Sequence, residues 1–333
     1  MNPKIDNFYI QWHLTDRCNL RCLGCYQDNF TNESDLPLSL LKNVANNLFE
    51  TLAGWNAKLS VMLTGGEPFL KNGLWDLIQY LNTSPLVSDI GIITNGTLID
   101  KHIDNLKNYS KLSKIHISLD GTTQNSNDEI RGSSTFKKVM ENIKLLKKHN
   151  IPVTVMFTLM KDNLKDAKNL YALLQPLGVE GFIIERFVPI GQGKTIADKV
   201  VNAQELYDLY EYYFKMLDVA YVPEEMAKYK AIQIKFGLQD IFTAECIVGR
   251  DGMAILPNAD VLPCRRFKLP IGNLLTTPLK EIWQSSQVLN EVRNKNNLKG
   301  KCRTCAHAEC IGCRAMTYSL CGDYLEADPH CWL

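Results

Sequence analysis

Residues 15–26 read Thr-Asp-Arg-Cys-Asn-Leu-Arg-Cys-Leu-Gly-Cys-Tyr, and this stretch decides how the chain is interpreted. It places Cys18, Cys22 and Cys25 at the spacing C-x3-C-x2-C, directly after an apolar run. Three thiolates on one short loop can hold three irons of a cubane cluster and leave the fourth iron without a protein ligand. Structural zinc sites favour two separated pairs of cysteines, and a disulfide would leave one cysteine over. A plain set of buried or free thiols is the remaining alternative.

The eleven cysteines are unevenly distributed over the 333 residues. Three lie within residues 18–25, none lies within 26–245, and eight follow from residue 246 onward. No apolar run approaches the roughly 20 residues that span a bilayer, and the N-terminus has no apolar signal region. We therefore expect a cytoplasmic protein with no membrane contact. In that reducing compartment clustered cysteines indicate metal sites rather than disulfides.

Composition excludes few other classes of protein. The chain is 45% hydrophobic and 22% charged, which is ordinary for a globular protein, and its length fits one large domain and one smaller domain. Its net charge is only +1, so no global field indicates binding to nucleic acid or to an anionic membrane.

Short apolar runs alternate with longer segments of helical periodicity. Alternating strands and helices favour parallel strands with right-handed crossovers, and six units predict an open (β/α)6 partial barrel of TIM type. The expected strands are Tyr9–Leu14, Leu59–Leu63, Ile90–Thr94, Ile115–Leu119, Val153–Phe157 and Phe182–Glu185.

Polar and glycine-rich loops follow the first four of these strands. After the cysteine loop come residues 64–68 (Thr-Gly-Gly-Glu-Pro), residues 94–97 (Thr-Asn-Gly-Thr) and residues 118–121 (Ser-Leu-Asp-Gly). Loops at the carboxyl ends of parallel strands meet at one rim, so we expect the active site there.

The cysteine motif, its place after the first strand and the aromatic residue behind its third cysteine resemble the radical S-adenosylmethionine (SAM) superfamily. The resemblance implies a catalytic [4Fe–4S] cluster on Cys18, Cys22 and Cys25, whose open iron chelates the amino and carboxylate groups of SAM. It implies that the Gly-Gly-Glu loop contacts the SAM amino group, through the Glu67 side chain or through backbone carbonyls. The residues expected at the SAM site are Tyr26, Gly65, Gly66, Glu67, Asn95, Ser118, Asp120 and Arg131.

A second cysteine field follows residue 245. The spacing C-x2-C-x4-C-x2-C over residues 302–313, after a hairpin pattern that ends on a cysteine, resembles the SPASM domain and its one or two auxiliary [4Fe–4S] clusters. We expect a barrel core in residues 1–235 and a SPASM domain in residues 236–333. The resemblance implies an outer cluster on Cys302, Cys305, Cys310 and Cys331, and an inner cluster on Cys246, Cys264 and Cys313.

Three details depart from the family pattern. The glycine often found five residues before the hairpin cysteine is Ala259, two gaps between the tail cysteines are one residue short, and Cys321 is extra. Cys321 is included among the expected metal ligands, although a free thiol and a catalytic acid are the alternatives. Zinc in the paired cysteines is the structural alternative to a cluster.

Three functions follow from these motifs. The first is a peptide or protein maturase, with a separate leader-binding partner if a leader must be captured. The second is a tetrapyrrole side-chain enzyme of the haem d1 or alternative haem type, in which Arg265, Arg266 and Arg314 would pair with propionates. The third is an electron carrier without turnover. We expect the maturase, with an external electron donor such as flavodoxin or ferredoxin.

The remaining features have plain structural interpretations. The aromatic stripe within residues 204–217 is expected to be a packing face. His13 and His116 lie in expected strands and are interpreted as satisfied core or rim groups. Gly191 and Gly193 are expected to form a turn under the SAM adenine or a simple exit loop.

Overall fold

The computed structural model describes residues 5–238 and 240–333; the expected domains also include residues 1–4 and 239, which lie outside that description. Six parallel strands pair in chain order, each with the next. The expected partial (β/α)6 barrel and all six of its strands are thereby confirmed. They are β1 (Asn7–His13), β2 (Lys58–Thr64), β3 (Val87–Thr94), β4 (Leu112–Ser118), β5 (Val153–Leu159) and β6 (Gly181–Arg186).

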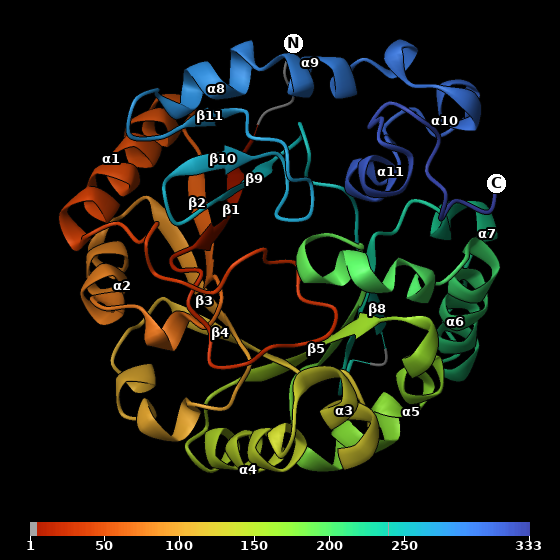
Figure 1. Cartoon of the computed structure of the whole chain (residues 1–333), viewed down its shortest axis with the longest axis horizontal. Coiled ribbons are helices and arrows are strands. Elements are labelled where there is room, and N and C mark those ends of the chain that lie inside the picture. The colour runs from red at the N-terminus through yellow and green to blue at the C-terminus, as the bar shows by residue number, and fades with distance from the viewer. Residues whose placement is uncertain (1–4, 239) are drawn as a thin grey trace.

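Helices cover the outer face of the curved sheet (Figure 1). Phe8, Ile10 and Trp12 of β1 are fully buried in the core between sheet and helices. Residues on alternate positions of a strand point to the opposite face, here the interior of the barrel. The barrel helices are α1 (Leu38–Trp55), α2 (Leu74–Thr83), α3 (Gln124–Arg131), α4 (Thr135–Lys148), α5 (Leu164–Leu174) and α6 (Ala203–Met216).

The C-terminal region extends the sheet at both ends. β7 (Ala231–Lys235) and β8 (Asp240–Ala244) continue it antiparallel beyond β6. β9 (Gly252–Ile255) pairs parallel with β1, and β10 (Asp260–Leu262) and β11 (Gly272–Asn273) follow outward. The expected division between residues 235 and 236 falls inside the β7–β8 hairpin and stays a prediction.

The last hundred residues close the ring between α1 and α7 (Pro223–Met226), as the blue segment in Figure 1 shows. The Asn47 side chain of α1 donates to the carbonyls of Leu274 and Thr277 at 2.8 and 2.9 Å. At the other side, the indole of Trp332 donates to the Pro223 carbonyl at 3.0 Å. The remaining helices are α8 (Leu279–Ser285), α9 (Gln287–Arg293), α10 (Gly300–Thr304) and α11 (Arg314–Cys321).

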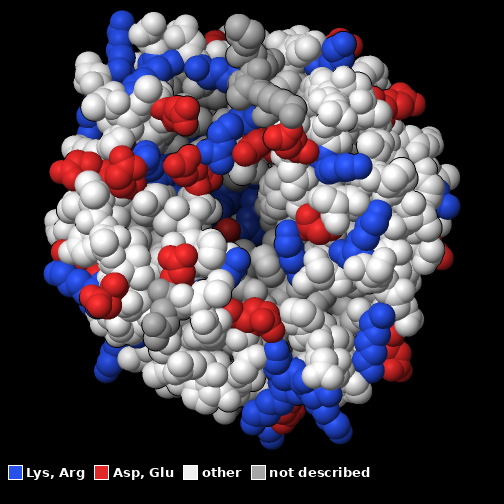
Figure 2. Space-filling model, turned by 180° about the vertical axis from the view of Figure 1, so that it is seen from behind, with Lys and Arg blue, Asp and Glu red and all other residues white. Residues whose placement is uncertain are grey.

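The aromatic stripe on α6 is buried at Leu206, Tyr210 and Tyr213, as expected of a packing face. Ala259 adopts a φ of 69°, which explains why related sequences favour glycine at this position. Acidic and basic side chains are mixed over the face seen from behind, around a central hollow (Figure 2). Within the described residues, no helix is long and apolar enough to cross a membrane.

Candidate active site

The cysteine loop follows β1 and lies across the carboxyl ends of the strands (Figure 1). Two glycines after β2 let the backbones touch: the Gly66 amide donates to the Thr15 carbonyl at 2.7 Å. A Cβ at Gly66 would lie 2.3 Å from the carbonyl oxygen of Arg17, and one at Gly65 2.3 Å from that of Thr15. Only glycine fits at these two positions, so the Gly-Gly pair positions the cysteine loop.

A second clamp comes from the loop after β6. The Gly193 amide donates to the Cys25 carbonyl at 3.0 Å. Gly191 has a φ of 58°, and a Cβ there would lie 2.3 Å from the Tyr26 carbonyl. These glycines therefore hold the cysteine loop by backbone contact, beyond the turn or exit loop expected from the sequence.

Cys18, Cys22 and Cys25 line one pocket of about 120 Å³ at this rim. Burial raises the pKa of all three thiols, that of Cys22 to about 11. A metal ligand must be a thiolate, so metal binding here would release protons. Seven of the eight residues expected to bind SAM line the same pocket: Tyr26, Gly65, Gly66, Asn95, Ser118, Asp120 and Arg131.

Arg131 is held by an ion pair inside the pocket. Its Nε lies 2.7 Å from Oδ2 of Asp120, and the side chain of Arg131 is only 11% exposed. Burial disfavours the guanidinium charge, but Asp120 and Cys22 outweigh it and raise the pKa of Arg131. The other oxygen of Asp120 accepts the Thr158 amide at 2.7 Å. The guanidinium is thus fixed and charged at the edge of the cysteine pocket.

Glu67 is placed differently from the other expected residues. Its carboxylate is fully buried and accepts hydrogen bonds from the Phe69 and Asn95 amides and from the Thr94 hydroxyl. Burial raises its pKa to about 7. The Glu67 side chain therefore braces two rim loops, and the geometry favours the alternative in which backbone carbonyls of this loop face the ligand.

Tyr26 and Asn95 orient the loop from inside the pocket. The Tyr26 hydroxyl donates to the Gly65 carbonyl at 2.6 Å, and the Asn95 amide lies 3.8 Å from the Cys18 sulfur. Sequence reasoning did not assign Met156, Thr158, Met160 and Glu185 to the site, although they line the pocket. All four lie in the second half of β5 or β6 or directly after it, so their position was a usable signal. Arg265, which the sequence offered to a substrate propionate, reaches the pocket from the C-terminal region.

The four cysteines expected to hold the outer cluster surround one pocket of about 330 Å³. Cys302 is the buried member; its sulfur accepts from the Asp328 amide at 3.3 Å and lies 3.7 Å from Nη2 of Arg314. Arg314 also donates to the carbonyls of Tyr324 and Glu326. Because Arg314 is 1% exposed and its guanidinium already donates to these tail carbonyls, the hypothesis that it pairs with a substrate carboxylate is wrong.

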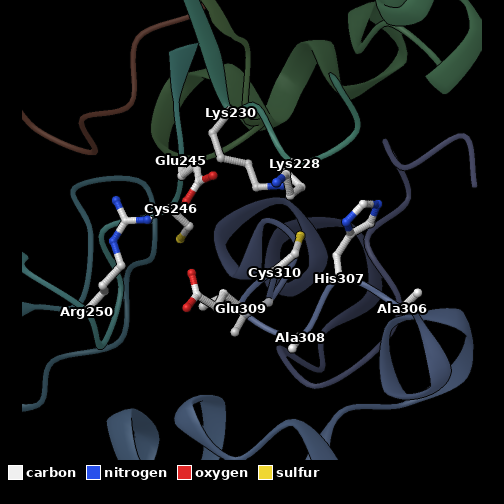
Figure 3. Close-up of a pocket in the computed structure, with 11 residues that line it drawn as sticks. Lys228, Lys230, Glu245, Cys246, Arg250, Ala306, His307, Ala308, Glu309 and Cys310 are labelled. Carbon is white, nitrogen blue, oxygen red and sulfur yellow. Dashed lines mark hydrogen bonds and ion pairs between the residues drawn. The ribbon is translucent and has the colours of Figure 1, made fainter. Parts of the chain in front are cut away.

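The three cysteines expected at the inner cluster also lie together. Burial raises the pKa of Cys246 to about 12, with a further contribution from the neighbouring thiols of Cys313 and Cys264. Cys246 faces Cys310 of the outer group across a pocket of about 270 Å³, which Lys228, Lys230 and Arg250 also border (Figure 3). Cys321 is exposed at the end of α11 and lines neither cysteine pocket, so the geometry favours the free-thiol alternative for it.

Residues 12–174 match the radical SAM superfamily, and residues 246–306 match the SPASM iron–sulfur cluster-binding domain. The chain belongs to the radical SAM superfamily. It is an enzyme that uses SAM and a three-cysteine [4Fe–4S] cluster, with one or two auxiliary clusters.

Radical SAM relatives resemble the chain over its whole length. The AdoMet-dependent heme synthase of Methanosarcina barkeri is 27% identical over 97% of this chain and 95% of its own. That of Nitratidesulfovibrio vulgaris is 28% identical over 97% and 91%. In fold, the chain resembles Streptococcus suis SuiB bound to the precursor peptide SuiA, with a TM-score of 0.75 at 17% identity, covering 98% of this chain and 76% of that one.

These relatives overturn one expectation. The expected peptide or protein substrate is wrong, because full-length relatives of higher identity are heme synthases. The likeness to SuiB shows the fold alone. The maturase was expected because of the SPASM-like cysteine tail. That tail fitted both the peptide maturase and the tetrapyrrole enzyme, so cysteine spacing could not distinguish the two substrate classes.

The donor sets fit the clusters of the family. Thiolates are the ligands that [4Fe–4S] clusters use, and the three-cysteine loop and the outer C-terminal group each border a pocket. Among the described residues, no three His, Cys, Asp or Glu side chains converge closely enough to hold a single metal ion. A cubane is bound at its corners, so its ligands lie farther apart than those of one ion.

Proposed function

We propose that this chain modifies a side chain of a tetrapyrrole, of the haem d1 or alternative haem type. The observation that carries the proposal is the full-length likeness to AdoMet-dependent heme synthases of two organisms. The pocket supports it, because Arg265 brings a positive charge to the wall beside the three cysteines. A buried guanidinium suits the carboxylates of such a substrate.

When bound, the cluster and SAM supply an electron and a carbon-centred radical that removes a hydrogen atom from the substrate. The chain's own residues hold and orient the reactants. Arg131, fixed by Asp120, suits the SAM carboxylate, and the carbonyls of the Gly-Gly loop suit its ammonium group. Burial raises the pKa of Tyr26, which keeps its hydroxyl protonated and bonded to the Gly65 carbonyl.

Removal of a hydrogen atom leaves an odd electron, which must leave before a closed-shell product forms. We propose that the C-terminal cysteine groups would hold the auxiliary clusters and that these would supply a one-electron acceptor there. An external one-electron carrier such as flavodoxin or ferredoxin would supply the catalytic cluster with its electron, in a reducing cytoplasm that disfavours disulfides between the eleven cysteines.

The test is anaerobic turnover of the reduced protein with SAM and an iron porphyrin that carries propionate side chains. We expect 5′-deoxyadenosine and a porphyrin of changed mass to accumulate together, and neither to form in a Cys18/Cys22/Cys25→Ala variant. Formation of 5′-deoxyadenosine with every porphyrin offered left unchanged would contradict the tetrapyrrole substrate.

A further inference from the structure

A second cavity of about 370 Å³ adjoins the cysteine pocket. Tyr26, Gln27 and Arg265 border both spaces, so the two cavities share a wall. The size of the second cavity falls within the range of small-molecule sites. Of the eight residues expected at the SAM site, only Tyr26 lines it, which leaves this cavity for the second reactant.

One wall of this cavity is apolar and comes from the hairpin region after β9. It consists of Leu256, Pro257, Leu262 and Pro270. Aliphatic side chains and proline rings make a wall without hydrogen-bonding groups, against which a flat apolar ring can pack. The opposite wall belongs to the cysteine loop and is polar. The cavity therefore combines an apolar slot with a charged rim.

At the wall shared with the cysteine pocket two guanidiniums meet a single carboxylate, whereas the acidic lining residues Asp16 and Asp28 belong to the cysteine-loop wall. Arg265 and Arg266 both pair with the same carboxylate, that of Glu185, Arg266 at 3.2 Å. Burial alone would raise the pKa of Glu185, but the two guanidiniums lower it, so it stays ionised. Two positive charges thus meet one negative charge. The Arg265 guanidinium also lies 5.3 Å from the centre of the Tyr26 ring, and both side chains belong to the wall that the two cavities share.

Lys268 adds a third cation at the outer end. It pairs with Asp28, whose side chain is 67% exposed. Exposed ion pairs contribute little, so a ligand carboxylate can replace Asp28 at small cost. The positive field reaches the inner wall: burial, helped by Arg265 and Lys268, lowers the pKa of His13 to about 3.

His13 itself is unexpectedly unsatisfied. It is 2% exposed and lines the cavity, and its Nε2 atom has no hydrogen-bond partner in the structure. The sequence-based expectation of a satisfied core group therefore fails for this atom. A buried polar atom without a partner is costly and calls for an explanation, and a ligand in the cavity that His13 lines would supply one.

Resting on the proposed function, we propose that this cavity is the substrate subsite. The edge of the substrate's planar apolar ring would pack against the wall of residues 256–270. One carboxylate of the substrate would pair with Arg265 and another with Lys268. Because Arg265 also lines the cysteine pocket, the substrate carboxylate that it binds would lie beside that pocket. Arg265 is thereby a specificity residue that selects carboxylate-bearing rings and aims one side chain at the radical.

The experiment is an anaerobic absorbance titration of the cluster-loaded protein with an iron porphyrin bearing four propionates, and with its methyl ester. We expect the free acid to bind at least about tenfold more tightly than the ester. Arg265→Gln should lose about tenfold or more of the affinity for the acid, with the ester unaffected. Lys268→Met should lose about two- to fivefold, and Lys268→Glu more.

Lys299→Gln is the matched control, because Lys299 pairs with exposed Asp323 and does not line the cavity; it should bind like the wild type. The EPR signals of the clusters check that each variant is folded. If Arg265→Gln loses its clusters, Lys268→Glu at the half-buried Lys268 decides instead. Wild type that prefers the acid, with all variants unchanged, would overturn the subsite and leave the proposed function standing. Wild type that binds neither porphyrin would overturn both.

Discussion

The two cysteine regions are held in opposite ways. Cys18, Cys22 and Cys25 lie on one short loop, and all three are partly exposed. Glycines of two neighbouring loops let those backbones contact the cysteine loop closely. The outer C-terminal group instead rests on the buried Arg314 side chain and the Asp328 amide, which both contact the Cys302 sulfur, while the buried Asp328 carboxylate accepts the Cys313 amide. A cluster that must admit SAM needs an open face, whereas one that only relays electrons can be enclosed. We therefore expect added bulk at the glycines to abolish cluster binding by the first region, and removal of buried charges to destabilise the second.

The largest effect is expected from Gly66→Ala. The new methyl group would collide with the Arg17 and Asp16 backbones at 2.3 and 2.6 Å, so the cysteine loop cannot dock. Iron analysis should show a loss of about four irons per chain, with the auxiliary EPR signals retained. Gly54→Ala in α1, where a Cβ meets nothing within 4 Å, is the control and should keep all its iron. Equal iron in both variants would argue against the backbone clamp.

Asp328→Asn should test the charged support of the second region. Burial alone would raise the pKa of Asp328, but Arg186 and Lys230 hold it at about 2. Removing the carboxylate charge leaves two buried cations uncompensated, at a cost of about 3–5 kcal/mol, so the urea midpoint should fall. The auxiliary clusters should also become easier to reduce in an EPR-monitored titration.

Asp323→Asn provides the comparison for that variant. Asp323 lies in the same tail but pairs with Lys299 near the surface. It should leave both the urea midpoint and the cluster potentials unchanged. A shift in the catalytic cluster of Asp328→Asn, with the auxiliary clusters unmoved, would refute the assignment of Asp328 to the second region.

Arg131→Gln should act on SAM rather than on iron. Losing a charge-assisted pair to the SAM carboxylate is expected to weaken SAM binding about ten- to hundredfold in equilibrium dialysis, with cluster content unchanged. Lys138→Gln on the adjacent α4, which breaks an exposed pair with Asp100, is the control. If SAM binds Arg131→Gln with wild-type affinity, the carboxylate is held elsewhere.

The smallest effect is expected from Cys321→Ser. Cys321 is exposed and apart from both C-terminal pockets, so iron content should not change and the free energy of unfolding should shift by less than about 0.5 kcal/mol. Cys302→Ser, by contrast, should lose about four irons. Loss of iron from Cys321→Ser would return this cysteine to the ligand set.

The barrel was predictable because its signals are local. The first and last residues of each expected strand lie within three residues of those observed. Apolar runs and helical spacing are short-range patterns, so they can be read from the sequence. The three-cysteine loop and most of the SAM-site residues were predictable for the same reason: they follow strand ends, and strand ends converge.

The rest depended on tertiary packing. Nothing near Arg265 in the sequence indicates that it crosses the barrel to Glu185, 80 residues earlier. The Glu67 carboxylate was an available ligand by sequence, and only the fold shows three donors already bound to it. The prediction of the substrate class failed for a related reason. Cysteine spacing indicates cluster binding and carries no information on the shape of a neighbouring cavity.

Iron and sulfide content with EPR, measured anaerobically on the wild type and on Cys18/Cys22/Cys25→Ala, tests the central claim most directly. The account predicts a loss of about four irons per chain, from about twelve to about eight with two auxiliary clusters or from about eight to about four with one, with the SAM-responsive signal lost and the auxiliary signals intact. An unchanged iron content in the variant would contradict the assignment of the catalytic cluster to this loop.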